Sequence, residues 1–305
     1  MTVAIDALYI LRDWQKGRTR LHTIEELDEY FREVENCFAR SSDEGLAALN
    51  KIRFTYKMPR RVDPFSQEYR QFQMDLYRQI SGRDTYDSYV NERSEFDFAA
   101  LKDRPFPYFT QSHRQVGEQL MAQGHVINSL SIKAGSKILE FGAGWGNLTT
   151  TLALMGHQVT AVEIDPLMND MLRHRAATLR VPLTVVASGM LDFDTTEKFD
   201  AVIFYEAFHH CIDPVRMLDK VTELLNPTGV VVFASEPITI FPYPWGLRTD
   251  GLSLWSIRKY GWLELGFDRK FWHRLLAAKG FSLERRKLSG VHIASLYIGK
   301  KTGRQ

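Results

Sequence analysis

The sequence has few of the features that mark secreted, zinc-binding or membrane-spanning proteins. Its 305 residues include only two cysteines, Cys37 and Cys211, which form no Cys-x-x-Cys pair, so neither a disulfide framework nor a zinc site is indicated. No apolar run approaches the ~20 residues that a membrane-spanning helix needs. Asp6, Arg12 and Asp13 interrupt the apolar N-terminus, which therefore lacks the pattern of a signal peptide. We expect a cytoplasmic protein without a membrane span.

Charge of one sign is also scarce, because the formal net charge is only +2. This balance gives no reason to expect nucleic acid as a partner. The basic runs at 285–287 and 300–304 are short, and such runs are usually solvated faces. The length and the hydrophobic content of 44% fit one large or two smaller globular domains.

The most informative stretch is residues 138–146, Ile-Leu-Glu-Phe-Gly-Ala-Gly-Trp-Gly. Its apolar run and the glycines that follow predict a strand, a tight turn and the start of a helix. Glycines let a backbone approach a ligand closely, although a turn that binds nothing is the plainer interpretation. The dinucleotide pattern Gly-x-Gly-x-x-Gly would need a glycine at Asn147. The glycines present are instead Gly142, Gly144 and Gly146, preceded by the acid Glu140.

A second acid favours a nucleoside-type ligand at this turn. Residues 157–163 predict a strand that ends in Glu163. A carboxylate about 20 residues beyond the glycines can accept hydrogen bonds from ribose hydroxyls. Ile164 is then placed to pack on the base. Asp165 is the competing carboxylate, but Asp165-Pro166 has the pattern of a helix cap and first helical position.

From residue 136 onward, predicted strands and helices alternate, which predicts a parallel sheet with helices on both faces. Two last strands, at 281–288 and 291–300, are joined by Ser289-Gly290 and predict an antiparallel hairpin. The earlier strands are expected at 137–140, 158–163, 183–187, 200–205 and 230–235, and the helices at 147–156, 166–180, 213–225 and 268–279.

The N-terminal part has a mainly helical pattern. Residues 1–57 and 65–80 carry apolar residues at helical spacing, and Thr23 with Glu26 has the pattern of a capping box. Residues 81–112 are rich in aromatics and proline, so they cannot form a long helix.

This pattern predicts two parts of the chain. Residues 81–112 are expected to be an ordered connector that crosses the mouth of the next domain, or else to serve packing only. We expect residues 1–112 to act as a lid, a substrate-binding region or a dimerisation region of a homo-oligomer. Residues 113–305, which open with a predicted helix at 113–130, then form the second domain with an insertion at about 237–267.

Three motifs together resemble those of class I S-adenosylmethionine-dependent methyltransferases. The acid-x-Gly-x-Gly-x-Gly turn is similar to the first motif of this family. The segment after its fourth strand is similar to residues 208–214, Phe-His-His-Cys-Ile-Asp-Pro. The segment before its fifth strand is similar to residues 225–229, Leu-Asn-Pro-Thr-Gly. The resemblance implies an α/β fold with a seven-stranded, mostly parallel, doubly wound sheet that ends in an antiparallel C-terminal hairpin.

The resemblance implies S-adenosylmethionine as the cofactor and S-adenosylhomocysteine as a product. In this family the first acid, here Glu140, lies near the methionine part of the cofactor. Many members carry an aspartate for the adenine amino group where this chain has Gly189, so adenine is expected to be held near Met190 and by Asp192, or by packing. The expected cofactor-binding residues are Glu140, Phe141, Gly142, Gly144, Gly146, Glu163, Ile164, Met190 and Leu191.

Candidate bases follow the fourth strand, where the transferred methyl group would point. Histidine titrates near neutral pH and suits proton abstraction, so His209 and His210 are candidates, although either one could merely cap a helix or pack. Glu206 and Glu236 are rival bases, or paired carboxylates for a divalent metal. Because no closer ligand pattern occurs, no metal is expected.

The acceptor is expected to be small or sugar-like, because aromatic faces stack on sugar rings and charged groups reach hydroxyls. The expected acceptor-binding residues are Glu236, Trp245, Arg248 and Tyr108, although such residues are also common in protein interfaces. The sequence therefore predicts methyl transfer to an oxygen of such an acceptor. The alternatives are N-methylation of a small metabolite and a non-catalytic protein that binds a partner through its N-terminal helices.

Overall fold

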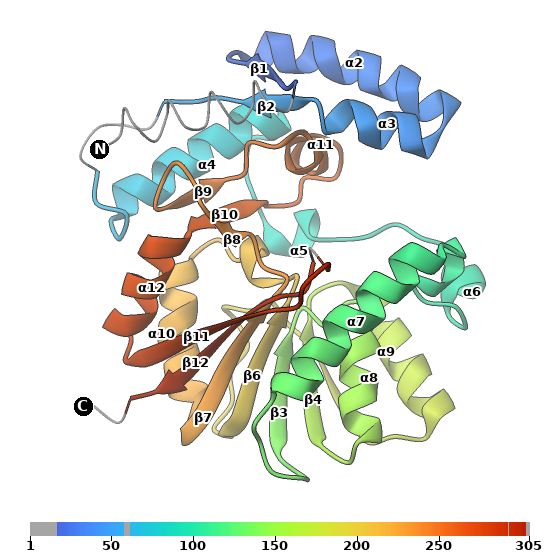
Figure 1. Ribbon diagram of the computed structural model, residues 1–305, viewed down its shortest axis with the longest axis vertical. Coiled ribbons are helices and arrows are strands. Elements are labelled where there is room, and N and C mark those ends of the chain that lie inside the picture. The colour runs from blue at the N-terminus through green and yellow to red at the C-terminus, as the bar shows by residue number, and fades with distance from the viewer. Residues whose placement is uncertain (1–16, 58–61, 292, 303–305) are drawn as a thin grey trace. The chain divides into compact units, whose positions relative to one another are not determined.

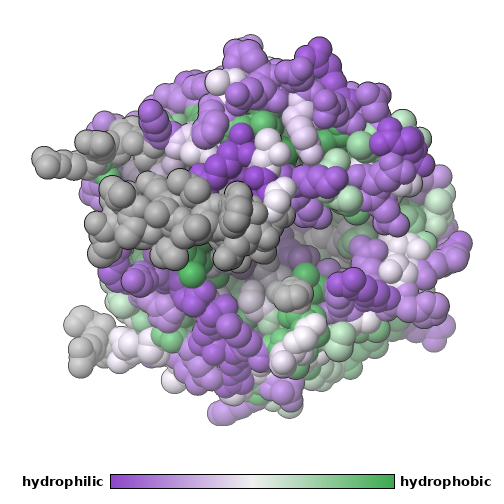
Figure 2. Space-filling model, turned by 45° about the horizontal axis from the view of Figure 1, so that its top comes forward, coloured by the Kyte–Doolittle hydropathy of each residue, from purple (hydrophilic) through white to green (hydrophobic). Residues whose placement is uncertain are grey.

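The computed structural model describes residues 17–57, 62–291 and 293–302. The predictions made for residues 1–16 therefore lie outside the described residues. Among the residues that are described, no helix is both long and apolar enough to cross a membrane. Hydrophilic side chains predominate on the face drawn in Figure 2, and hydrophobic ones form small areas between them.

The chain divides into two compact units, each built from two stretches. The first comprises residues 1–87 and 238–271, and the second comprises 88–237 and 272–305. This division differs from the boundary expected after residue 112, because the connector packs on the turns of the second unit.

The first unit combines helices with two small sheets (Figure 1). The predicted capping box is confirmed, since Thr23 Oγ1 accepts a hydrogen bond from the Glu26 N–H and the Glu26 carboxylate accepts one from the Thr23 N–H. The two short strands before residue 57 were not predicted, because three-residue strands carry little periodicity. The elements are β1 (Thr19–Leu21), α2 (Ile24–Arg40), α3 (Ser42–Leu49), β2 (Ile52–Phe54), α4 (Gln67–Ser81), β8 (Ile238–Thr239), β9 (Trp245–Leu247), α11 (Gly251–Lys259) and β10 (Leu265–Asp268).

Buried hydrogen bonds join the two stretches of the first unit. The Tyr69 hydroxyl donates to the Trp245 carbonyl at 2.6 Å. The Leu247 N–H donates to Gln73 Oε1 at 2.9 Å. Because α4 supplies both of these side chains, the inserted stretch depends on an N-terminal helix for partners of its buried backbone groups.

The second unit contains the predicted seven-stranded sheet, in the order β11-β12-β7-β6-β3-β4-β5. Five strands pair in parallel, and β11 and β12 pair antiparallel, as predicted. The strands are β3 (Lys137–Phe141), β4 (Gln158–Glu163), β5 (Leu183–Ala187), β6 (Phe199–Tyr205), β7 (Leu225–Ala234), β11 (Phe281–Lys287) and β12 (Ser295–Lys301). The helices are α5 (Ser88–Asn91), α6 (Phe98–Leu101), α7 (His113–Ser129), α8 (Asn147–Leu154), α9 (Pro166–Leu179), α10 (Pro214–Leu224) and α12 (Arg269–Ala278), which crosses the unit boundary.

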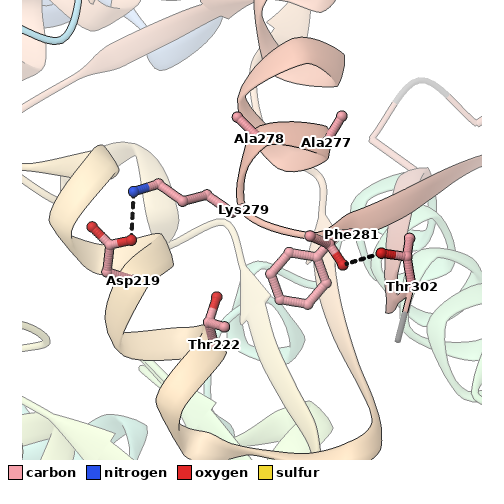
Figure 3. Close-up of a pocket in the computed structure, with 8 residues that line it drawn as sticks. Asp219, Thr222, Ala277, Ala278, Lys279, Phe281 and Thr302 are labelled. Carbon is pink, nitrogen blue, oxygen red and sulfur yellow. Dashed lines mark hydrogen bonds and ion pairs between the residues drawn. The ribbon is translucent and has the colours of Figure 1, made fainter. Parts of the chain in front are cut away.

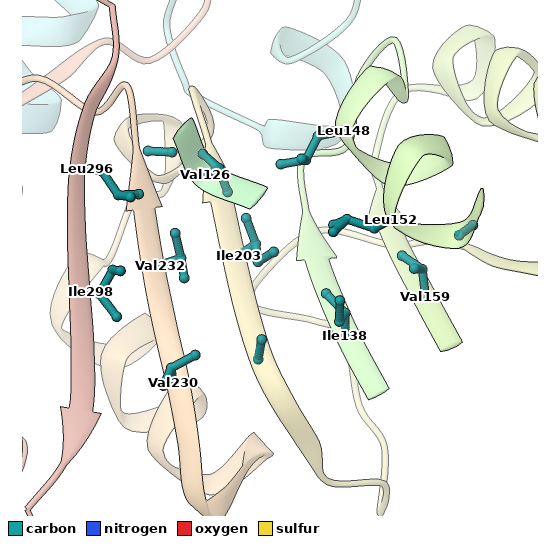
Figure 4. Close-up of a cluster of buried hydrophobic side chains, with 13 residues drawn as sticks. Val126, Ile138, Leu148, Leu152, Val159, Ile203, Val230, Val232, Leu296 and Ile298 are labelled. Carbon is teal, nitrogen blue, oxygen red and sulfur yellow. The ribbon is translucent and has the colours of Figure 1, made fainter. Parts of the chain in front are cut away.

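Helices cover both faces of this sheet, as the alternation predicted. On one face, Val126 of α7 and Leu152 of α8 pack against strand residues such as Ile138 and Ile203 (Figure 4). On the other face, Trp272 of α12 packs edge-on against Phe233 of β7 at 4.9 Å between ring centroids. Alternate residues of a strand point to opposite faces, so each strand contributes to both cores.

Two details of the strands differ from the prediction. The hairpin connection is not the two-residue turn Ser289-Gly290, because β11 ends at Lys287 and β12 begins only at Ser295. Strand β7 begins earlier than predicted, because Leu225 pairs with Phe199 before the register shifts at Ala201.

We expect Thr23→Ala to lower the free energy of unfolding of the first unit by about 1 kcal/mol, because an orphan N–H of α2 loses its acceptor. Thr23→Ser keeps the hydroxyl and should remain close to wild type. Equilibrium urea unfolding of the full chain measures both variants. Equal stabilities of the alanine and serine variants would contradict the capping role.

Candidate functional site

Parallel pairing brings five strand ends to one edge of the second unit. Strands β7, β6, β3, β4 and β5 are neighbours in this order. In open sheets of this kind, ligands bind outside the carboxyl ends of the strands. The predicted cofactor residues and candidate bases all follow or end these strands, so this edge is the candidate site.

The glycine turn after β3 is tightly bent and open in front. Gly142 and Gly144 have φ angles of 65° and 50°, which side chains rarely adopt. A Cβ at Gly142 would lie 2.6 Å from the Ala207 Cβ, so no larger residue fits there. No heavy atom lies within 4 Å of the place where a Cβ of Gly144 would stand. The turn therefore packs against the end of β6 and leaves room for a ligand at Gly144.

Glu163 at the end of β4 holds this turn in place. One of its oxygens, Oε2, accepts a hydrogen bond from the Gly144 N–H at 2.9 Å. The other, Oε1, accepts from the N–H groups of Ile164 and Asp165 at 2.8 and 2.9 Å. Burial raises the pKa of Glu163, while the N–H groups of Asp165 and Gly144 oppose the rise. An ionised carboxylate has about four acceptor positions, so one position remains for a ligand hydroxyl.

Glu140 lies in β3 beneath the glycine turn and is 2% exposed. The Thr149 hydroxyl of α8 donates a hydrogen bond to Glu140 Oε2 at 2.6 Å. Burial raises the pKa of Glu140 to about 7; the Thr149 hydrogen bond opposes the rise, and the neighbouring Glu163 adds to it. Glu140 can therefore ionise near neutral pH when a cationic group approaches.

Glu236, which follows β7, is buried and fixes the turn that carries the histidines. Its oxygens accept hydrogen bonds from the N–H groups of Ala207 and Phe208 at 2.8 Å each and of His209 at 3.2 Å. The His209 ring atom Nδ1 lies 2.8 Å from Glu236 Oε2. Burial alone would raise the pKa of Glu236, but the His209 ring and the N–H groups hold it below its ordinary value. An ionised Glu236 can only accept, so Nδ1 carries the proton and Nε2 is the basic nitrogen.

The other two candidate bases have different surroundings. His210 Nδ1 lies 3.1 Å from Glu92 Oε2, and its ring centroid is 4.2 Å from that of His209. Glu206 is exposed and has a φ angle of 52°, a conformation that costs free energy outside glycine. His209 is therefore the candidate base whose ring is oriented by a fully buried carboxylate.

Residues of the connector contact the turns at this edge, in agreement with the expectation that the connector crosses the mouth of this domain. Each of its contacts falls on a different turn: Tyr89 bonds Asp192, Glu92 pairs with His210, the Ser94 N–H donates to Asp165, and Phe96 packs on Trp145. The Asn147 amide also donates to the Phe106 carbonyl at 2.7 Å. Residues 88–112 of the connector therefore pack on the second unit, whereas the role of the connector as a lid stays a prediction.

Several predicted site residues have other surroundings. Phe141 is fully buried and stacks on Phe204 at 5.3 Å, so only its backbone faces the turn. Ile164, Met190 and Leu191 lie at the ends of β4 and β5, as predicted, and each is partly buried.

The predicted acceptor-binding residues fall in different units. Trp245 is 1% exposed in the core of the first unit, where its indole N–H donates to the Pro64 carbonyl. Arg248 of the same unit pairs with Asp250 and Glu264 at 3.0 and 3.2 Å. The role of Trp245 and Arg248 as acceptor contacts stays a prediction. Tyr108 lies in the second unit, in a short turn, and is 36% exposed.

A surface hollow of about 670 Å³ lies at the opposite edge of the sheet. Its lining includes Asp219 and Thr222 of α10, Lys279 and Phe281 (Figure 3). The Lys279 ammonium group is paired with Asp219 there. Because the hollow borders the start of β11, at the amino ends of the parallel strands, it is separate from the candidate site.

Residues 139–233 match the family described as "Methyltransferase domain". An uncharacterized methyltransferase of Geobacillus kaustophilus is 34% identical over 141 residues, which cover 45% of this chain and 62% of that protein. One of Bacillus cytotoxicus is 33% identical over 118 residues, covering 38% of this chain and 53% of that protein. The chain thus spans less than two thirds of the length of these curated relatives.

A solved complex of the Haloferax volcanii Trm112 methyltransferase activator with a methyltransferase contains a chain of similar fold. The TM-score is 0.53 at 14% identity, and the match covers 71% of this chain and 99% of that chain. At this identity the likeness supports the fold alone.

We expect Glu140→Gln to change how stability depends on pH. The folded pKa of about 7 lies above the ordinary value of 4.5, so the folded state binds the proton more tightly. Stability due to protonated Glu140 is therefore present at low pH and lost as the pH rises towards 7, by about 3 kcal/mol in total.

The glutamine variant should lack this component and be more stable than wild type at pH 8. Urea unfolding between pH 5 and 8 measures the difference, with Glu197→Gln, an exposed carboxyl in the same unit, as the control. Parallel pH profiles of wild type and Glu140→Gln would contradict the raised pKa.

Proposed function

We propose that this chain, which carries a class I S-adenosylmethionine-dependent methyltransferase domain at residues 139–233, transfers a methyl group to an oxygen of a small or sugar-like acceptor. S-Adenosylmethionine is the cofactor of this class of domain. The acceptor and the methylated atom are the parts that belong to the proposal.

The residues at the sheet edge fit this cofactor. Gly144 leaves open space beside the turn, and Glu163 keeps an acceptor position for a ribose hydroxyl. Glu140, with its pKa of about 7, can ionise opposite an ammonium group. When bound, the cofactor supplies a methyl group that its sulfonium sulfur has already activated. The protein must then align an acceptor with that group, which is mainly a matter of proximity and orientation.

The single observation that carries the oxygen assignment is the Glu236–His209 pair. A hydroxyl acceptor must lose its proton as its oxygen gains the methyl group. Glu236 keeps a proton on His209 Nδ1, so His209 Nε2 takes the proton from the hydroxyl. The O–H bond would break as the O–C bond forms; the methyl group would give up its bond to the sulfonium sulfur, which leaves as a neutral thioether, and the proton would remain on the imidazole.

The hydrogen bonds of Glu236 weigh against a divalent metal held by Glu206 and Glu236. They do not decide between O-methylation, N-methylation and a non-catalytic protein. Both oxygens of Glu236 already accept N–H groups, which leaves this carboxylate poorly placed as a metal ligand beside Glu206. A neutral amine is already a good nucleophile and loses its proton after the methyl group has been transferred, so it needs such a base less than a hydroxyl does. A non-catalytic protein needs neither a general base nor a metal.

A screen of hydroxyl and amine acceptors with product mass as the readout tests the proposal. We expect a gain of one methyl group on a hydroxyl compound. Calorimetric titration of the folded protein with S-adenosylmethionine separates the non-catalytic alternative, which predicts no binding. Product formation from amines alone would instead establish N-methylation.

We expect His209→Ala to lower turnover by about 10²–10⁴-fold, the usual contribution of a general base, while cofactor affinity stays close to wild type. His210→Ala and Glu206→Gln are the matched comparisons, and each should have a smaller effect. Single-turnover rates and calorimetric affinities measure the set. Similar small losses in all three variants would remove His209 from the role of base.

Glu236→Gln tests the positioning of His209. The glutamine oxygen can still accept the N–H groups of Ala207 and Phe208, so two of the three backbone hydrogen bonds that fix the turn persist, and the longer one from the His209 N–H is lost. Its amide NH₂ would face Nδ1 and place the ring proton on Nε2, as when an orienting carboxylate becomes an amide in a serine-protease triad.

We expect kcat to fall by about 10²–10⁴-fold, with KM and melting temperature near wild type. A variant that loses stability or raises KM instead would indicate that Glu236 serves only to support the turn.

A further inference from the structure

The basic run Arg285-Arg286-Lys287 is divided between the two faces of β11. Alternate residues of a strand point to opposite faces, so Arg285 and Lys287 share one face and Arg286 lies on the other. Arg286 is paired on its own face, since its Nε lies 2.7 Å from Glu284 Oε1. The run is therefore not one solvated patch, and Arg285 and Lys287 form a separate pair of cations.

Arg285 and Lys287 line a hollow of about 430 Å³ at the connection between β11 and β12. This hairpin hollow also includes Ser295 and Ser289, whose hydroxyl groups can donate hydrogen bonds. Among the described residues that line it, two are cationic and none is acidic. Its volume lies in the range of small-molecule sites, and a concave surface with charges of one sign attracts an ion of the opposite sign.

The Arg285 guanidinium is held in place but has unused hydrogen-bond donors. It lies over the Tyr297 ring, 5.3 Å from the ring centroid. Its Nε is buried without a hydrogen-bond partner, and neither Arg285 nor Lys287 forms an ion pair within the described part of the chain. A buried donor without an acceptor costs free energy, and a planar guanidinium matches two oxygens of a phosphate or carboxylate group. The hollow is therefore suited to an oxyanion.

The hairpin hollow lies at the same edge of the sheet as the candidate base. Strand β12 is antiparallel to both β11 and β7, so β11 ends at the edge where the parallel strands end. The carbonyl of Ser295, a lining residue, accepts a hydrogen bond from the Ser235 N–H at 2.8 Å. Ser235 directly precedes Glu236, which orients His209. The wall of the hollow is thus bonded to the backbone that holds the candidate base.

The order of the strands separates this hollow from the cofactor turns. Strand β11 is two strands from β7 and four strands from β3, which correspond to about 10 and 19 Å at the usual strand spacing. The amino-acid end of the cofactor is expected near the turn after β3, so its carboxylate is too far away to be the anion. A small phosphorylated or carboxylated molecule can span the shorter distance.

We propose that the hairpin hollow binds an oxyanion of the methyl acceptor, a phosphate or carboxylate group, through Arg285 and Lys287. The acceptor hydroxyl then lies at His209 while the oxyanion lies at the end of β11. The inference rests on the proposed function for the reaction, and it narrows the acceptor from small or sugar-like molecules to acidic ones. Binding of the anion needs no methyl transfer, so the two proposals can be tested separately.

Calorimetric titration with inorganic phosphate tests the oxyanion site, with sodium chloride at matched ionic strength as the blank. Wild type should bind phosphate in the millimolar range. Arg285→Gln should weaken this affinity by at least about tenfold, because charge-assisted hydrogen bonds are lost, and Lys287→Gln by about threefold. The matched control is Arg286→Gln, which removes the same charge from the other face of the same strand and should stay within about twofold of wild type.

A conservative variant and a second ligand keep the result interpretable. Arg285→Lys retains the charge over Tyr297 without the fork of donors, so it should recover part of the affinity that Arg285→Gln loses. All variants should bind S-adenosylhomocysteine as wild type does, and melting temperatures identify any variant that loses its fold. No phosphate binding by wild type, or equal losses in Arg285→Gln and Arg286→Gln, would overturn this inference and leave the proposed function standing.

Matched acceptors, such as glucose 6-phosphate and glucose, test whether the oxyanion belongs to the substrate. We expect methylation of the phosphorylated or carboxylated member of such pairs. For a productive acceptor, Arg285→Gln should raise KM by about tenfold or more and leave kcat within about threefold, and inorganic phosphate should compete with the acceptor. Methylation of neutral members alone, or activation by phosphate, would overturn the acceptor assignment. A protein that binds phosphate through Arg285 but methylates no acceptor would support the oxyanion site and overturn the proposed function.

Discussion

The structure of the second unit depends on the hydrogen bonds that satisfy the carboxylates buried at one edge of its sheet. A buried charge without partners costs several kcal/mol, so each acid must be satisfied where it stands. Glu163 receives three N–H groups and Glu236 receives three N–H groups and an imidazole. The bonds that satisfy these acids also fix the turns after β3, β4 and β6. Among the residues that the structure describes, Glu140 accepts only from the Thr149 hydroxyl, so burial raises its pKa to about 7 against a single opposing hydrogen bond.

Differences in surroundings separate residues that look alike in the sequence. His209 and His210 are adjacent, yet the first is oriented by a buried carboxylate and the second by the partly exposed Glu92. Glu206 and Glu236 both follow central strands, yet Glu206 is exposed, whereas Glu236 is buried and its oxygens accept hydrogen bonds from backbone N–H groups. The chemical roles proposed for these four residues follow from burial and hydrogen bonding.

The sequence was most informative where a pattern is local or periodic. The strand-turn-helix around Gly142, the cap at Asp165 and the alternation of strands and helices that builds the parallel sheet all follow from such patterns. Contacts between distant residues have no such signal. Nothing in the pattern around Tyr89 indicates a bond to Asp192, and nothing around Trp245 indicates that its ring would be buried against Tyr69. The aromatic residues of 237–267 therefore predict a ligand-binding surface, whereas one of them, Trp245, lies in the core of the first unit.

The interleaved order of the two units has a consequence for synthesis. Helix α4 emerges from the ribosome early, but the carbonyl and N–H groups that Tyr69 and Gln73 bind belong to residues 245 and 247. Roughly 175 residues must be translated in between, which takes on the order of ten to thirty seconds at usual elongation rates. During that interval the second unit is also unfinished, since it awaits β12. The nascent chain therefore exposes apolar faces of the first unit until β10 has been translated and of the second unit until β12 has been translated, and chaperones have that long to engage it.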